Sequence, residues 1–171
     1  MPGSSSPRAD ALILFGATGD LTRRRLIPAI YELAADGDLD MPVLGVSRRD
    51  IGDDGFRELV AEALEQASVE VDEAVLSKLT ANLAYVEGDY RDPSTFQRIG
   101  ERIGGRTCTV SFLAIPPGLF DEVVEGLAAA GLNAQGRLVV EKPFGRDTES
   151  ARQLNEIIHR HYPEERVYRI D

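Results

Sequence analysis

The sequence has few of the residues that build disulfide frameworks or metal clusters. Among 171 residues, Cys108 is the only cysteine and there are two histidines. We therefore expect neither a disulfide-stabilised fold nor a Cys/His metal centre. No apolar stretch approaches the ~18 residues of a membrane helix, and residues 1–10 lack the apolar segment of a secretory signal. We expect no metal, no membrane partner and a cytoplasmic location.

Positive charge is also scarce relative to negative charge. Acidic residues outnumber basic ones 29 to 19, which gives a formal net charge of -10. Such a chain is repelled by phosphate backbones, so we expect no nucleic-acid partner. The hydrophobic content of 43% and the charged content of 28% are those of an ordinary globular protein. Residues 1–10 are expected to form a flexible tail, and residues 11–171 a single domain.

Short apolar runs alternate with segments of helical periodicity along residues 11–171. This alternation is typical of an α/β fold in which helices cover a parallel sheet. The runs expected as buried strands are Ala11–Phe15, Pro42–Val46, Ala84–Val86, Cys108–Ile115, Arg137–Val140 and, as a sixth candidate, Arg166–Ile170. The helical stripes expected to face the sheet are Leu26, Ile30 and Leu33; Phe56, Leu59, Val60 and Leu64; Leu119, Val123, Val124 and Leu127; and Leu154, Ile157 and Ile158. Two further helices are expected at Asp72–Leu83 and Pro93–Ile103.

Two glycines follow the first predicted strand directly. Gly16 and Gly19 stand where dinucleotide-binding folds seat a pyrophosphate. A glycine lets a phosphate approach the backbone, and the free N–H groups of the helix from Leu21 attract its negative charge. The pattern is G-x-x-G-x-x-T, with Thr22 where a third small residue is usual. A turn glycine followed by a helix-capping Asp20 is the alternative interpretation of this segment.

The tip of the second predicted strand carries Ser47, Arg48 and Arg49. NAD-binding folds commonly place an acidic residue there, roughly 20 residues after the glycines, to bind the ribose 2′-hydroxyl. A guanidinium can instead pair with the 2′-phosphate of NADP through two hydrogen bonds, and Ser47 can add a hydroxyl donor. NADP is therefore the expected coenzyme. A solvated strand end is the alternative for the two arginines.

These residues belong to a longer pattern that resembles the coenzyme domain of glucose-6-phosphate dehydrogenase. The resemblance runs from Leu12 to Asp171. Its motifs are Gly16-Ala-Thr-Gly-Asp-Leu21, Gly45-Val-Ser-Arg48, Phe112-Leu-Ala-Ile-Pro-Pro117, Glu141-Lys-Pro-Phe-Gly-Arg-Asp147 and Arg169-Ile-Asp171. It implies a Rossmann-like, doubly wound, mostly parallel sheet with helices on both faces. It also implies hydride transfer from C1 of glucose 6-phosphate to NADP, which yields 6-phosphogluconolactone at the start of the pentose phosphate pathway.

The resemblance also implies roles for individual residues. It places the glycine turn around the pyrophosphate, Arg48 on the 2′-phosphate, and the Ala-Ile-Pro-Pro segment beside the nicotinamide. Lys142 would lie between coenzyme and sugar and bind both, whereas by itself it would be taken for a solvated lysine. With the strand tip included, the predicted coenzyme site comprises Gly16, Ala17, Thr18, Gly19, Asp20, Leu21, Ser47, Arg48, Ala114, Pro116, Pro117 and Lys142.

The last residue of the chain has an implied catalytic role. In the family, the aspartate at Asp171 orients a histidine of a second domain, which takes the proton from the C1 hydroxyl. That histidine has no counterpart here, because His159 and His161 are expected to face water at the end of the helix from Thr148. We therefore expect a chain that holds NADP, binds glucose 6-phosphate weakly or not at all, and is nearly inactive alone.

Other functions remain open at this point. The chain could be a free-standing NADP-binding sensor, or an interaction module that pairs with a separately encoded catalytic domain. In the family a second domain packs beside this one, so some apolar surface near the C-terminus is expected to be exposed. Self-association is expected to follow from such a surface.

Overall fold

Six parallel strands form a single sheet at the centre of the molecule. The computed structural model describes residues 7–142 and 146–170. The strands are β1 (Ala11–Phe15), β2 (Val43–Ser47), β3 (Leu83–Glu87), β4 (Thr109–Leu113), β5 (Arg137–Glu141) and β6 (Val167–Ile170). Their order in the sheet is β3-β2-β1-β4-β5-β6, and each neighbouring pair is parallel. The predicted doubly wound parallel sheet is confirmed, and its strand order reverses between β1 and β4.

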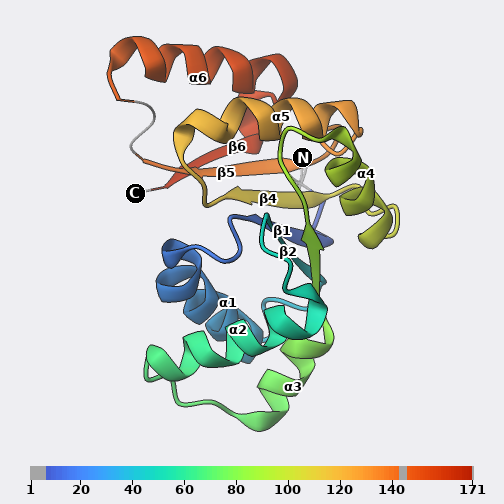
Figure 1. The fold of residues 1–171 in the computed structure, drawn as a ribbon, viewed down its shortest axis with the longest axis vertical. Coiled ribbons are helices and arrows are strands. Elements are labelled where there is room, and N and C mark those ends of the chain that lie inside the picture. The colour runs from blue at the N-terminus through green and yellow to red at the C-terminus, as the bar shows by residue number, and fades with distance from the viewer. Residues whose placement is uncertain (1–6, 143–145, 171) are drawn as a thin grey trace, which may run out of the picture.

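Helices form a layer on each side of the sheet (Figure 1). On one side lie η1 (Thr22–Leu26), α1 (Ile27–Ala35), α2 (Gly52–Gln66) and α3 (Glu73–Ala81). On the other lie α4 (Pro93–Arg102), α5 (Phe120–Ala129) and α6 (Thr148–His161), with the short 3-10 turns η2 (Pro117–Leu119) and η3 (Glu164–Arg166) in the connections. Each layer packs its own buried apolar cluster against one face of the sheet. In the part of the chain that the structure describes, no helix has the length and hydropathy to cross a bilayer.

The helix after β1 starts with a wide π-helical turn. The Ile27 N–H donates to the Thr22 carbonyl, five residues back. Pro28 follows immediately, and a proline ring collides with the carbonyl of the residue four positions before it in an α-helix, here Arg24. The wider turn accommodates that ring, which explains a π-helical turn directly beside the glycine pair.

One half of a sheet face, formed by β4, β5 and β6, carries apolar residues that are only partly buried or exposed. The cluster beneath α1, α2 and α3 takes its buried strand residues from β1, β2 and β3, and Val110 and Phe112 of β4 pack against it. The register places five apolar residues of the other three strands on that same face, and we call them the open half-face: Val110, Phe112, Val139, Tyr168 and Ile170. Tyr168 is 46% exposed and Ile170 39% exposed. The apolar surface expected near the C-terminus is therefore confirmed.

One predicted core residue is not in the core. Leu33 was assigned to the buried stripe of α1, but it is 44% exposed. The sheet-facing side of α1 is formed instead by Ile27, Ile30 and Tyr31, all buried. Periodicity predicted the helix correctly but assigned Leu33 wrongly to its buried face.

Candidate functional site

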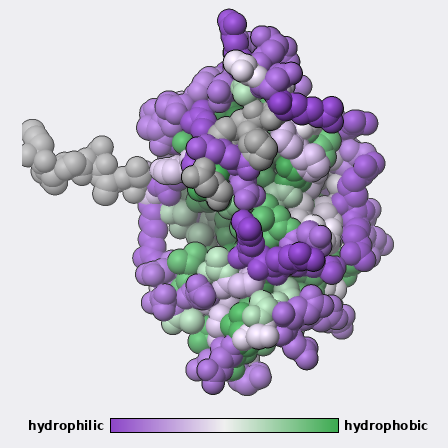
Figure 2. Space-filling model, turned by 90° about the vertical axis from the view of Figure 1, so that its left-hand side faces the viewer, coloured by the Kyte–Doolittle hydropathy of each residue, from purple (hydrophilic) through white to green (hydrophobic). Residues whose placement is uncertain are grey.

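The predicted site residues gather at one edge of the sheet, where the parallel strands end. The turn after β1, the tip of β2 and the segments after β4 and β5 all lie there. Figure 2 faces this side of the molecule and shows apolar surface reaching the outside between hydrophilic side chains. Ligands of open α/β sheets bind at this edge, near the point where the strand order reverses.

Gly16 has a backbone conformation and a neighbour that both require glycine. Its φ is +82°, and a Cβ built on it would lie 2.1 Å from the Ala114 carbonyl oxygen at the end of β4. A Cβ on Gly19 would lie 3.3 Å from the Gly16 oxygen. The turn is thus folded tightly against the end of β4 at Gly16, where only a residue without a side chain fits. A glycine turn at this point of the fold is where dinucleotide-binding proteins seat a pyrophosphate.

The threonine that replaces the third small residue of the pattern holds the turn. Thr22 is fully buried, and its hydroxyl donates to the Gly16 carbonyl over 2.9 Å. The first turn of the helix is therefore fastened to the glycine turn by a hydrogen bond. Asp20 is exposed, and within the described residues this helix has no side-chain cap, so the capping alternative is not supported.

Tyr90, from the loop between β3 and α4, also holds this turn and was not predicted. Its hydroxyl accepts from the Gly16 N–H over 2.9 Å and donates to the Val46 carbonyl over 3.3 Å. Burial raises the pKa of Tyr90 to about 12, although the Gly16 hydrogen bond opposes this. The hydroxyl therefore stays protonated at neutral pH. A single tyrosine in a loop carries no sequence signal for this contact.

A chain of hydroxyl groups connects the glycine turn to the tip of β2. The Thr18 hydroxyl donates to Ser47 Oγ over 3.1 Å, and Ser47 Oγ lies 2.5 Å from the Tyr85 hydroxyl. The Tyr85 hydroxyl donates in turn to the Arg49 carbonyl over 2.6 Å. Since Tyr85 has a single proton to give, Ser47 is the donor to Tyr85. Ser47 is buried within this hydroxyl chain, and its contact with a coenzyme stays a prediction.

Arg48 projects into solvent from the same strand tip. Its side chain is 75% exposed, and Nη2 lies 3.2 Å from Oδ2 of Asp89, which follows β3. A surface ion pair of this kind contributes only about 0 to 1 kcal/mol. The guanidinium is therefore held near the edge of the sheet but is easily released to a better anionic partner.

A pocket of about 290 Å³ lies beside the glycine turn, at the ends of β4 and β5. Its lining includes five of the predicted residues, Leu21, Ala114, Pro116, Pro117 and Lys142. Lys142 is exposed, and its backbone N–H donates to the Ile170 carbonyl over 2.9 Å. Glu141 lines the pocket as well, so an apolar wall is combined with one ammonium and one carboxylate group, which suits a ligand with a flat ring and a hydroxylated part.

Ala17 lies beneath the turn and is fully buried. A Cβ on Gly45 would come within 2.9 Å of the Ala17 Cβ, so the turn and β2 meet closely there. The Ala17 N–H donates to the Val46 carbonyl over 3.2 Å. Its part in the site is to support the turn, and a direct contact with coenzyme stays a prediction.

The remaining predicted residues lie outside this edge or outside the described chain. Asp171 is among the residues that the structure does not describe. His159 and His161 end α6, which runs from the end of β5 back towards the start of β6, so they lie at the opposite edge of the sheet. They lie 2.9 Å from Glu164 and 3.0 Å from Glu125, respectively. Neither histidine can reach the candidate site.

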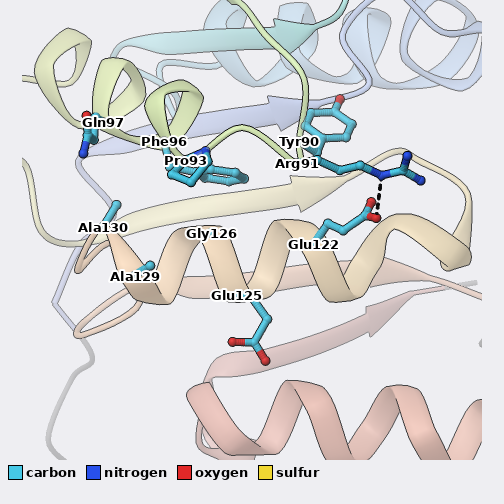
Figure 3. A pocket seen from close by; sticks show the side chains of 10 residues that line it. All are labelled: Tyr90, Arg91, Pro93, Phe96, Gln97, Glu122, Glu125, Gly126, Ala129 and Ala130. Carbon is cyan, nitrogen blue, oxygen red and sulfur yellow. Dashed lines mark hydrogen bonds and ion pairs between the residues drawn. The ribbon is translucent and has the colours of Figure 1, made fainter.

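Two other pockets lie among the helices α4, α5 and α6. One of about 560 Å³ continues from Pro116 and Pro117 between the starts of α5 and α6. The other, of about 400 Å³, runs between α4 and α5 and is closed at one end by the Arg91–Glu122 ion pair (Figure 3). None of the predicted coenzyme residues lines this second pocket. The candidate site is therefore placed at the glycine turn and Arg48 because of the chemistry of these residues, although the other two pockets are larger.

Comparison with known protein families gives one assignment. Residues 13–171 match the family described as "Glucose-6-phosphate dehydrogenase, NAD binding domain". Glucose-6-phosphate 1-dehydrogenase 1 of Mycobacterium tuberculosis is 35% identical over 163 residues, which are 95% of this chain and 35% of the relative. Glucose-6-phosphate 1-dehydrogenase of Dickeya dadantii is 35% identical over 100% of this chain and 36% of the relative. The chain thus spans about a third of the length of these relatives.

Solved structures agree with this assignment. Glucose-6-phosphate 1-dehydrogenase from Mycobacterium avium superposes with a TM-score of 0.92 at 38% identity, over 96% of this chain and 36% of that one. A glucose-6-phosphate dehydrogenase in complex with glucose-6-phosphate superposes with a TM-score of 0.85 at 26% identity, over 98% of this chain and 37% of that one. The fold described above is therefore the fold of the corresponding part of these enzymes.

Proposed function

The chain belongs to the glucose-6-phosphate dehydrogenase family, whose NAD-binding domain it matches, and we propose that it holds NADP for the oxidation of glucose 6-phosphate. The observation that carries this proposal is the meeting of three features at one edge of the sheet. These are the Gly16 turn packed under Ala114, the exposed Arg48, and the pocket that ends at Lys142. Family membership supports the same coenzyme.

Each feature has a distinct role in the proposal. The turn and the first N–H groups of its helix bind the pyrophosphate, and Arg48 pairs with the 2′-phosphate. Pro116 and Pro117 exclude water on the nicotinamide side, and the Lys142 ammonium binds a sugar hydroxyl. When bound, NADP supplies the acceptor for the hydride that leaves C1 of the sugar.

The proton at the C1 hydroxyl needs a separate group. We assign Asp171 to orient a histidine that lies outside this sequence, by analogy with the family pattern. A positioned base of this kind contributes about 10² to 10⁴ in rate. The described residues offer no replacement, since His159 and His161 lie at the far edge of the sheet. The chain alone should therefore bind coenzyme but not turn over sugar.

Calorimetric titration of the purified chain tests this proposal. We expect NADP to bind more tightly than NAD, and we expect no NADPH production from glucose 6-phosphate beyond a buffer blank. The reason is that the coenzyme residues lie within this chain whereas the general base does not. Absence of NADP binding would refute the proposed function, and turnover at an enzyme-like rate would refute the assignment of the base.

We propose that the open half-face is buried by association with a second copy of this chain, and pairing with a separate catalytic domain is the alternative. Tyr168 and Ile170 expose apolar surface next to the half-buried Val139, and contiguous surface of this kind favours contact with another apolar surface. Tyr168→Ser is therefore expected to lower the fraction of dimer or larger species in sedimentation velocity. Tyr168→Phe keeps the apolar area and should not change it. Equal behaviour of both variants and the parent chain would contradict the proposal.

A further inference from the structure

The hydroxyl group of Tyr85 occupies a position from which it controls the residues on both sides of Arg48. Tyr85 belongs to β3, the strand beside β2, and only 6% of it is exposed. It accepts a hydrogen bond from Ser47 over 2.5 Å and donates one to the Arg49 carbonyl over 2.6 Å. Ser47 and Arg49 are the neighbours of Arg48 in the chain. The same hydroxyl therefore holds the Ser47 side chain and the Arg49 carbonyl, one on each side of the arginine.

A third hydrogen bond closes this arrangement. The Arg49 N–H donates to Ser47 Oγ over 3.3 Å, so that both backbone groups of Arg49 are held by hydroxyls. The Tyr85 ring packs on Phe56 of α2, with ring centroids 5.7 Å apart. Burial raises the pKa of Tyr85, so its proton is present at neutral pH and is available to the Arg49 carbonyl.

The Arg48 side chain has no comparable anchor of its own. It is largely exposed, and its one described ion pair, with Asp89, is at the surface. The direction in which the guanidinium points is therefore set mainly by the backbone from which it projects. Loss of an anchor on that backbone would let the guanidinium sample more positions, and a bidentate pair with a phosphate tolerates little misplacement.

We infer that Tyr85 is a positioning residue for coenzyme selectivity, which aims Arg48 at the 2′-phosphate through Ser47 and Arg49. This inference rests on the proposed function, since it requires that Arg48 bind that phosphate. Tyr85 is expected to affect binding of the 2′-phosphate without affecting binding of the pyrophosphate. The Thr18–Ser47 hydrogen bond does not involve Tyr85, so the pyrophosphate part of the site keeps its support when the tyrosine hydroxyl is removed.

The test is the ratio of NADP to NAD affinity in Tyr85→Phe, measured by calorimetry on the full chain. NADP affinity should fall about fivefold to tenfold, because the hydrogen bonds of the hydroxyl to Ser47 and Arg49 are both lost, while NAD affinity should change less than about twofold. The ratio is the decisive quantity, because general destabilisation would weaken both coenzymes alike.

Tyr31→Phe is the matched control. Tyr31 is a buried tyrosine of the same apolar cluster, and its hydroxyl accepts from the Asp72 N–H over 2.7 Å, away from the candidate site. It should lose similar stability in urea without changing the coenzyme ratio. A shift of the ratio in Tyr31→Phe as large as that in Tyr85→Phe would overturn the inference.

A double variant tests whether Tyr85 acts through Arg48. In an Arg48→Ala background, Tyr85→Phe should leave the ratio unchanged, because no guanidinium is left to position. The inference would be overturned if Tyr85→Phe changed the NADP/NAD affinity ratio as much in that background as in the parent chain, or if it left the ratio unchanged in the parent chain. Neither outcome would contradict NADP binding by the parent chain. Failure of the parent chain to bind NADP would overturn the proposed function and this inference together.

Discussion

Replacing Arg48 with glutamate is expected to weaken NADP binding on the order of 100-fold, because a charge-assisted pair with the 2′-phosphate is lost and a like charge takes its place. NAD carries no phosphate at that position, so its affinity should fall only a few-fold. The side chain is exposed and its Asp89 contact is weak, so the substitution should not unfold the domain. Calorimetric titration with both coenzymes measures the two losses side by side.

The matched control for this charge reversal is Arg160→Glu. Arg160 is exposed in the last turn of α6, at the opposite edge of the sheet, and the substitution changes the net charge by the same amount. Because the chain is already strongly acidic, any general repulsion of NADP should appear equally in both variants. The difference in NADP affinity between the two variants measures the specific contribution of Arg48. Equal losses for NADP and NAD in Arg48→Glu would mean that the residue does not contact the 2′-phosphate.

The sheet could be predicted because buried parallel strands have a distinctive composition. All six predicted runs overlap strands of the structure. The segments between consecutive runs contain the crossover helices. The largest error was in the run Cys108–Ile115, where the strand is only Thr109–Leu113. Ala114 and Ile115 continue the apolar sequence beyond the last strand residue, since they line the pocket beside the glycine turn. Apolar character alone cannot separate a buried strand from an apolar site wall.

The candidate site was predictable to the extent that its motifs are local. Glycine spacing and the Arg48 position are visible in a few consecutive residues, and the structure brings both to the same edge. Tyr85 and Tyr90 act across the sheet on residues 36 and 74 positions away, through single hydroxyls on Arg49 and Gly16. No composition or period records such a contact, because it depends on how the loops after β2 and β3 fold over the ends of the strands.

Gly16→Ala is expected to damage both the fold and the site. A left-handed φ costs an alanine about 1 to 2 kcal/mol, and forcing a methyl group into a packed position adds about 1 to 3 kcal/mol. The methyl would lie 2.1 Å from the Ala114 oxygen, a backbone atom that cannot rotate away. We therefore expect the free energy of unfolding in urea to fall by roughly 2 to 5 kcal/mol.

Gly37→Ala separates the two contributions to that loss. Gly37 has almost the same φ, +78°, but a Cβ there would meet nothing within 4 Å. It should lose only the conformational cost, about 1 to 2 kcal/mol, and keep full NADP affinity. Gly16→Ala can relieve its clash only by moving the turn, which breaks the hydrogen bonds from Thr22 and to Tyr90. Coenzyme binding should therefore be lost even at low temperature, where the variant is folded. Equal stability losses in the two variants, with NADP binding retained in both, would show that the turn can yield, and the tight fit against Ala114 would then not be what shapes the site.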